Sequence, residues 1–445
     1  MIFNSIKEKS IYYNLPVLLF SILPFSLITG PLLSDFSISL ISILFLIYCK
    51  KHKNFSFFNN EYFYIFIFFW LYLIVNSLIN NLNFDSLKIS FFYIRYGIFV
   101  IAITALINTD AKFIKYFFYC IFTCFTILVI DGFYQYFVGE NILGLKSQNI
   151  HRVSSFFHEE LILGSYLSRL WPIFFGLTLI VLKKKNRLFY FVISIFILSE
   201  ALIFLSGDRS AFFYINFSAI FVIVLAKNLQ KLRIVTLICS LFIITIISLI
   251  NPTAKERIID ITLKDMNVSI DKIRIDKNSK VMNFFSEKNK NDNDNDNDNG
   301  MYIFSKQHTH HYITAYKMFL DNKILGVGVK NFRNFCNDEK YNVSILSCST
   351  HPHNTYVQIL SETGLIGFLF LILILLYFCS YIMLHLIGKF KGRYYFSDFD
   401  ICVLSGIAIY LFPVIPTGNV FNNWLNIIFI LYLPFLLCSK NLSKI

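Results

Sequence analysis

The chain has 445 residues, of which 56% are hydrophobic and only 15% are charged, and its mean hydropathy is +0.60. This composition excludes a soluble domain, which carries about 25% charged residues, and predicts an all-α integral membrane protein. The net charge of +13 does not indicate nucleic-acid binding, because the basic residues stand in short clusters between apolar runs, where they fix membrane topology.

Twelve apolar runs predict about 12 transmembrane helices. They lie near residues 12–30, 33–49, 61–79, 89–107, 114–136, 159–182, 188–205, 210–226, 233–250, 358–386, 400–416 and 423–438. Nine spans therefore form an N-terminal membrane region over 1–250, and three form a C-terminal one over 358–445. Lys and Arg are concentrated in every second connection, so the positive-inside rule places these connections and both termini in the cytoplasm.

The two membrane regions are separated by a large extracytoplasmic loop, residues 251–357. Its stretch near 289–300 reads NKNDNDNDNDNG, which has no apolar residue to bury, so we expect it to be disordered. Further along, apolar residues recur at the spacing of a short amphipathic helix. These residues are Tyr312, Ala315, Tyr316 and Phe319.

Two of the nine cysteines, Cys336 and Cys348, lie in this loop, and the other seven lie in or beside the spans. In an oxidising compartment the two can form a disulfide. Two free thiols are the alternative, and the sequence does not decide between them.

A histidine motif, His351–Pro352–His353–Asn354, closes the loop. Pro352 favours a helix start, so His353 is expected at a helix N-terminus near the outer interface, where the helix dipole favours an anion. The alternative is a histidine that only caps the helix. The first turns of this helix carry a polar stripe, which needs polar partners or a wet cavity. The stripe consists of Asn354, Gln358, Ser361 and Glu362.

Arginines near the outer ends of spans are a second signal. Each must face an anion, a carboxylate or water, because burying an unpaired charge in a membrane is costly. They are Arg95, Arg152, Arg169 and Arg209, the last of them in the turn 206–210. Pairing with carboxylates such as Asp131, Glu200 and Asp208 is one reading. A diphosphate site formed together with the helix N-terminus is the other.

Motifs for several other chemistries are missing: no P-loop, no G-x-G-x-x-G after a strand and no H-E-x-x-H occurs. Five histidines in the loop do not have the spacing of a usual zinc site, so we expect no metal and no cofactor. These histidines are His308, His310, His311, His351 and His353.

The residues His353–Asn354, followed after nine residues by Gly364-x-x-Gly367, resemble a pattern of the O-antigen ligase/polymerase superfamily. The stretch 315–332 resembles the loop segment of that family, and the turn 206–209 resembles the one that carries its functional arginine. At the position of a second family arginine, just before the loop helix, this chain has histidines instead.

The resemblance implies a GT-C-like glycosyltransferase of the bacterial inner membrane that works without a metal. Its donor would be a polyprenyl-diphosphate-linked glycan, and its acceptor a sugar hydroxyl on lipid A core or another glycan, on the periplasmic face. Membrane lipids, and no nucleic acid, are its other expected partners.

The chemistry assigns roles to individual residues. A sugar diphosphate is already a good leaving group, so the site needs cations for the diphosphate and a base for the acceptor hydroxyl. We expect His353 to be the base of an inverting displacement. The diphosphate is expected to bind Arg209, Arg152, His308 and His311, and the motif residues that support the site are Asn354, Glu362, Gly364 and Gly367.

Three alternatives stay open. An O-antigen polymerase, which joins lipid-linked repeat units, shares the same loop and histidine. An O-linked protein glycosyltransferase is a second variant. A polysaccharide transporter or lipid flippase would predict two similar halves, and no repeat between 1–220 and 220–445 is visible.

Overall fold

The computed structural model describes residues 10–80, 84–147, 152–182, 186–250, 255–260 and 305–442. The Asn/Asp tract near 289–300 lies outside the described residues. Within the described part the chain is mostly helical, as predicted, and no β-strand is formed there.

The helices before the large loop are α1 (Ile11–Ser21), α2 (Leu23–Thr29), α3 (Pro31–Lys51), α4 (Glu61–Ile79), α5 (Phe84–Phe92), α6 (Ile94–Thr109), α7 (Ile114–Val138), α8 (Leu163–Val181), α9 (Arg187–Leu205), α10 (Arg209–Leu225) and α11 (Gln230–Ile250), with short turns η1 (Ser56–Phe58), η2 (Ala111–Phe113) and η3 (Ser155–Glu160). The later elements are η4 (Glu256–Asp260), α14 (Lys306–Asp321), α15 (Phe332–Phe335), α16 (Thr355–Phe390), α17 (Asp398–Leu411), α18 (Asn423–Leu437) and α19 (Ser439–Leu442).

Each of the twelve expected spans falls on one helix or on two consecutive helices. Among the described residues, eight candidate spans are long and apolar enough to cross a membrane, or nine if α1 and α2, which meet at 53°, count as one bent span. Apolar helices satisfy their backbone groups internally, as a lipid environment demands. Because α10, α17 and α18 are shorter, a count of twelve stays a prediction.

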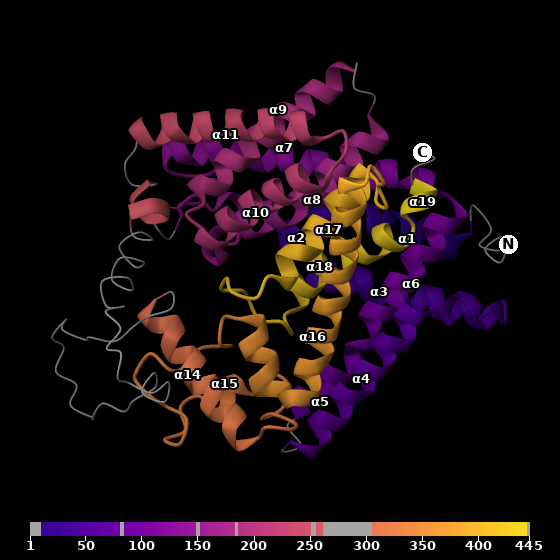
Figure 1. Cartoon of the computed structure of the whole chain (residues 1–445), viewed down its shortest axis with the longest axis vertical. Coiled ribbons are helices and arrows are strands. Elements are labelled where there is room, and N and C mark those ends of the chain that lie inside the picture. Colours follow the sequence, from indigo (N-terminus) through magenta and orange to yellow (C-terminus); the bar gives the residue numbers. More distant parts are fainter. Residues whose placement is uncertain are drawn as a thin grey trace.

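The centre of the bundle is α8, which packs against α7, α9, α10 and α17 (Figure 1). Its side chains Leu167, Trp171 and Phe174 are fully buried. By contrast, α4, α11 and α16 leave most of their apolar surface exposed, as helices that face lipid do. The core thus holds α8 in a fixed position, and this matters because α8 carries a cation of the site.

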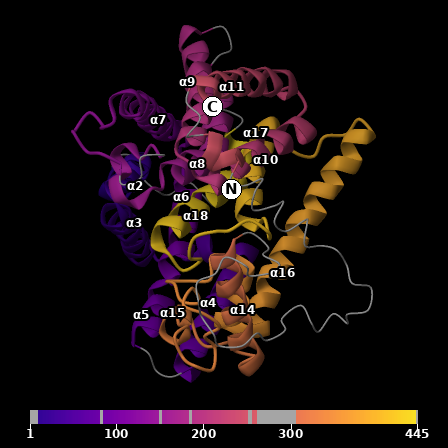
Figure 2. The same ribbon diagram turned by 90° about the vertical axis from the view of Figure 1, so that its left-hand side faces the viewer.

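The segment 305–353 forms a small unit at one end of the bundle, where α14 and α15 pack against α16 (Figures 1 and 2). The predicted amphipathic helix is present as α14, and it buries Ala315 and Met318 against Phe332. Cys336 and Cys348 form a disulfide in this unit, with their Cα atoms 5.0 Å apart.

Connections that the alternation of spans places on one side of the membrane contact each other. On the expected inner side, Tyr13 Oη donates to Asp110 at 3.2 Å, and Asn441 Nδ2 donates to Asn108 at 2.6 Å. The backbone N–H of Lys227, also on that side, donates to Asp398 at 2.7 Å. The expected outer connections meet at the cavity described below.

One basic residue departs from the topology pattern. Arg233, which the charge pattern assigns to an inner flank, is fully buried at the start of α11. Its guanidinium pairs with Glu200 at 2.5 Å and lies over the ring of Trp171, 4.3 Å from the centroid. Glu200 also accepts a hydrogen bond from Ser240. Glu200 therefore pairs with an arginine, as the sequence analysis allowed. The partner, Arg233, is a residue that the charge pattern had placed in water on an inner flank.

Candidate functional site

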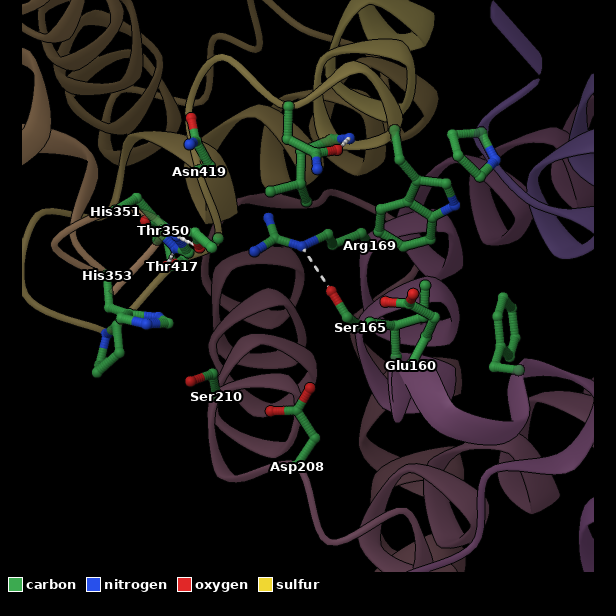
Figure 3. A pocket seen from close by; sticks show the side chains of 18 of the residues that line it. Glu160, Ser165, Arg169, Asp208, Ser210, Thr350, His351, His353, Thr417 and Asn419 are labelled. Carbon is green, nitrogen blue, oxygen red and sulfur yellow. Dashed lines mark hydrogen bonds between the residues drawn. The ribbon is translucent and has the colours of Figure 1, made fainter. Parts of the chain in front are cut away.

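The expected outer connections enclose a cavity of about 1330 Å³. Its lining comes from the α2–α3 turn, the segment before α8, the turn before α10, α14, the loop 330–353 and the α17–α18 connection. Its charged and histidine residues are Arg152, Glu160, Arg169, Asp208, Arg209, His308, Lys330, Arg333, His351 and His353. Figure 3 shows part of this wall, with His353 on one side of the space and Arg169 reaching in from the other.

His353 lies where the loop turns into α16. Its backbone has a φ of 58°, in the left-handed region, and its carbonyl accepts a hydrogen bond from Thr417 N–H at 2.8 Å. Its ring nitrogen Nε2 lies 3.0 Å from the hydroxyl of Ser349. Burial lowers the pKa of His353 below 6.5, which keeps its ring neutral at pH 7, as a base must be.

The next residue, Asn354, anchors the motif. Its side-chain oxygen caps α16 by accepting from Tyr356 N–H and Val357 N–H, and its amide nitrogen donates to the carbonyl of Pro413 at 2.8 Å. The H-N pair thus fixes the start of α16 to the α17–α18 connection. This arrangement explains why a side chain with both an acceptor and a donor follows His353.

Three further histidine rings surround His353. The ring centroids of His351, His308 and His311 lie 4.0, 5.3 and 5.3 Å from that of His353. His351 and His308 line the cavity, whereas His311 is fully buried behind His353 and does not line it. Burial lowers the pKa of His308 and His311 to about 4 and that of His351 to about 3, so these rings are neutral at pH 7.

The glycines of the motif allow a break in α16. Gly364 has φ 62° and ψ −164°, and a Cβ there would lie 2.2 Å from the carbonyl oxygen of Ile324. The loop backbone pairs with the broken turn, since Val327 N–H donates to Ser361 O at 2.9 Å and Leu365 N–H donates to Lys323 O at 2.8 Å. The unit formed by 305–353 is therefore bonded directly to the broken turn of α16, the helix that begins just after His353.

The polar stripe of α16 finds partners in protein. Both carboxylate oxygens of Glu362 accept from the loop, one from Lys330 N–H at 3.0 Å and one from Phe332 N–H at 3.1 Å. Gln358 donates to Glu362 and to Asn419, at 3.0 and 2.9 Å. Glu362 thus holds the loop in place, and it does not line the cavity.

The arginine side of the cavity rests on α7. Gln135 accepts from the backbone N–H groups of Ser154 and Ser155, and Asp131 accepts from the hydroxyl of Ser155 and from Ile142 N–H. Asp131 therefore supports the segment after Arg152 and is not the arginine partner that one reading suggested.

Arg152 and Arg209 meet at the turn 206–210. Arg152 donates to Ser206 O at 2.8 Å and to Leu161 O at 3.0 Å. Gly207, with φ 64°, leaves no room for a Cβ, which would lie 2.9 Å from side-chain carbons of both Arg152 and Arg257. Burial lowers the pKa of Arg152, the charge of Asp208 acts in the opposite direction, and the charge of Arg257 lowers this pKa more weakly. Three arginines therefore crowd one turn, a charge arrangement that favours a bound anion.

Residues 189–372 match the family model described as O-antigen ligase. This part of the chain, less than half of its length, is similar to the O-antigen ligase family. The resemblance inferred from the motifs is confirmed there, and the matched segment contains the Arg209 turn, α14, His353 and both motif glycines. The family is glycosyltransferase-like, of the ligase or polymerase type, and the match supports a membrane enzyme in this broad sense. No curated protein matches the chain.

Three cations that line the cavity were missing from the residues predicted to form the site. Arg169 was noticed in its span; its buried guanidinium lies between the rings of Tyr214 and Tyr410, 4.7 and 4.6 Å from their centroids, and lines the cavity. Lys330 carried no local signal beyond lying in the family-like segment 315–332, and Arg333 follows directly after that segment. Arg95, in contrast, pairs with Asp35 at 2.6 Å and does not line the cavity.

Proposed function

We propose that this enzyme transfers a glycan from a polyprenyl diphosphate to a sugar hydroxyl at the periplasmic face of the bacterial inner membrane. The observation that carries the proposal is the single cavity in which His353 faces the cluster of Arg152, Arg169 and Arg209. A neutral base and several cations are what displacement of a sugar diphosphate needs. The family match supports the same class of reaction.

The reaction follows from these groups. The acceptor oxygen attacks the anomeric carbon while His353 takes the hydroxyl proton, and the bond from that carbon to the diphosphate oxygen breaks. The lipid diphosphate leaves with the bonding electrons, and Arg152 and Arg209 stabilise its charge. Arg169 lies deeper in the bundle, where it can contact the same diphosphate. Direct displacement inverts the anomeric centre.

His308 occupies the place of the second family arginine. Its Nδ1 lies 2.8 Å from the Ser305 hydroxyl, which caps α14, and its ring lines the cavity. A bound diphosphate would raise its pKa and favour the charged ring. We propose that His308 binds the diphosphate directly, while His311, which is buried, acts only by supporting the ring of His353.

Lipid A core is the proposed acceptor, and an O-antigen polymerase is the alternative within the family.

The contacts among connections on each side support a single topology, and by the positive-inside rule the basic flanks favour the outer face for the cavity. Both termini are accordingly proposed to be cytoplasmic.

Surface polysaccharide from a deletion strain tests this function. A ligase predicts that polymer is lost from lipid A and accumulates on the carrier lipid. Single repeat units on lipid A would instead identify a polymerase, and an unchanged polysaccharide would contradict both. Complementation with His353→Ala should fail, whereas Lys317→Gln, an exposed position on α14 that does not line the cavity, should restore the polymer.

A further inference from the structure

We propose that Lys330 and Arg333 form a second anion subsite, which binds a phosphate group on the acceptor glycan. The proposal rests on the function proposed above and names a property of its acceptor. Both side chains line the cavity, and neither belongs to the arginine cluster at the turn 206–210.

We place the subsite on the His351 side of His353 and the arginine cluster on the His308 side. The ring of His308 lies 5.3 Å from the ring of His353, and the charge of Arg209 lowers the pKa of His308, whereas the charge of Arg333 lowers the pKa of His351. The ring of His351 lies 4.0 Å from His353, and the guanidinium of Arg333 donates to the carbonyl of Thr350, the neighbour of His351, at 3.2 Å. His353 thus contacts one ring that the charge of Arg209 influences and a second ring that lies beside the Arg333 segment.

The two cations are fixed by the fold. The backbone of Lys330 has a φ of 62° and is held by Glu362, whose oxygens accept from the N–H groups of Lys330 and Phe332. Arg333 lies in the one-turn helix α15, three residues before the disulfide-bonded Cys336. The carboxylate of Glu362 accepts from backbone N–H groups and from Gln358, and among the described residues no carboxylate lies within ion-pair distance of either side chain. The charges of Glu362 and Asp85 nevertheless act to raise the pKa of Lys330, against the larger effect of burial.

Reaction geometry assigns this side to the acceptor. In a direct displacement the attacking oxygen approaches the anomeric carbon from the face opposite the leaving diphosphate, and the base lies beside the attacking oxygen. With the diphosphate on the Arg209 side of His353, the acceptor lies on the Arg333 side. A lysine and an arginine that line one cavity and repel each other suit a dianionic phosphate, which would be held by charge-assisted hydrogen bonds.

The test uses the full chain in proteoliposomes with a lipid-linked glycan donor and two acceptors: lipid A core, and the same lipid A core treated with phosphatase. For the wild type, dephosphorylation should raise the acceptor KM about tenfold or more, the usual size of a lost charge-assisted contact. Arg333→Gln and Lys330→Gln should raise the acceptor KM for the phosphorylated form and be much less sensitive to dephosphorylation. The donor KM should stay unchanged.

Two variants control for misfolding and for general charge loss. Arg333→Lys, which keeps the charge but not the bidentate contact, should recover part of the acceptor affinity and stay sensitive to dephosphorylation, and Lys317→Gln should respond to dephosphorylation as the wild type does. Equal KM increases for Arg333→Gln on both acceptors, or a wild type indifferent to dephosphorylation, would overturn the subsite while leaving the transferase reading intact. A wild type that transfers to neither acceptor would overturn the proposed function, and the subsite with it.

Discussion

The ring of His311 stacks on the ring of His353, with centroids 5.3 Å apart and ring planes inclined by 23°. His311 is fully buried, and neither of its ring nitrogens has a hydrogen-bond partner among the described residues. His353 is therefore held between a buried ring behind it and the cavity in front. This arrangement fixes the orientation of a base without giving that base a competing proton acceptor.

His353→Ala is expected to lower the transfer rate by about two to four orders of magnitude, the usual effect of losing a general base. The protein should still insert, because His353 lies at the cavity wall. In the wild type, kcat should fall as the pH drops through the His353 pKa, which burial places below 6.5. If His353→Ala keeps the wild-type transfer rate in reconstituted vesicles, His353 is not the general base.

His311→Ala separates support from chemistry. Because the side chain does not reach the cavity, this change should lower kcat by a smaller factor than His353→Ala and leave the donor KM near the wild-type value. A marked rise in the donor KM would instead show that His311 contacts the diphosphate, as the sequence suggested.

Arg209→Lys is expected to weaken donor use by about tenfold or more. Lysine keeps the positive charge but cannot form the bidentate contact of a guanidinium with phosphate. The loss should appear in kcat/KM for the donor, and the acceptor KM should be unaffected. Arg95→Lys is the matched control, because Arg95 pairs with Asp35 away from the cavity. Similar losses in both variants would point to a folding effect.

His308→Arg is expected to keep activity and to change its pH dependence. Burial lowers the pKa of His308 to about 4, so donor binding must raise this pKa for the ring to become charged. A group whose pKa rises on binding favours binding at low pH, and the advantage disappears as the pH rises through the bound-state pKa. The donor KM of the wild type should therefore increase with pH above about 4. The permanent charge of the arginine in His308→Arg should remove this dependence. Identical pH profiles of the donor KM for the wild type and His308→Arg would contradict diphosphate binding by His308.

Gly364→Ala is expected to destabilise the protein. The left-handed φ alone costs about 1–3 kcal/mol for a side chain, and the new Cβ would lie 2.2 Å from the backbone oxygen of Ile324, which cannot move without breaking the loop pairing. Gly392→Ala is the milder comparison, since Gly392 has a similar left-handed φ of 71° but a Cβ there would meet nothing within 4 Å. Thermal unfolding in detergent measures the difference. Equal melting temperatures for the two variants would contradict the importance of the break.

Cys336→Ser is expected to cost on the order of 3 kcal/mol, because the disulfide closes a short loop that carries Arg333. Reducing agent should lower the melting temperature of the wild type and leave that of Cys336→Ser unchanged. Mass spectrometry of non-reduced peptides should recover Cys336 joined to Cys348. Two free thiols in protein purified without reductant would rule out the bridge.

The local sequence pattern was enough to predict the helices, the histidine motif and the arginine turn. Apolar runs of membrane length form helices because a bilayer leaves the backbone no other partner, and each expected span coincides with helical residues. The start of α16 was equally readable, since an asparagine after Pro352 and His353 caps a helix through contacts within its own first turn. The alternation of basic clusters also predicted which connections lie on the same side of the membrane, and connections of one side contact each other in the structure.

Only the tertiary structure decided what each charge and ring does. Arg95, Arg169 and Arg233 all occur in apolar helices, yet one pairs with Asp35, one reaches the cavity between two tyrosines and one forms a buried pair with Glu200. These outcomes depend on which helices cross at that depth, and sequence spacing contains no such information. For the same reason, two nearby histidines of α14 have different surroundings. His308 lines the cavity, whereas His311, three residues further along the chain, is buried behind His353.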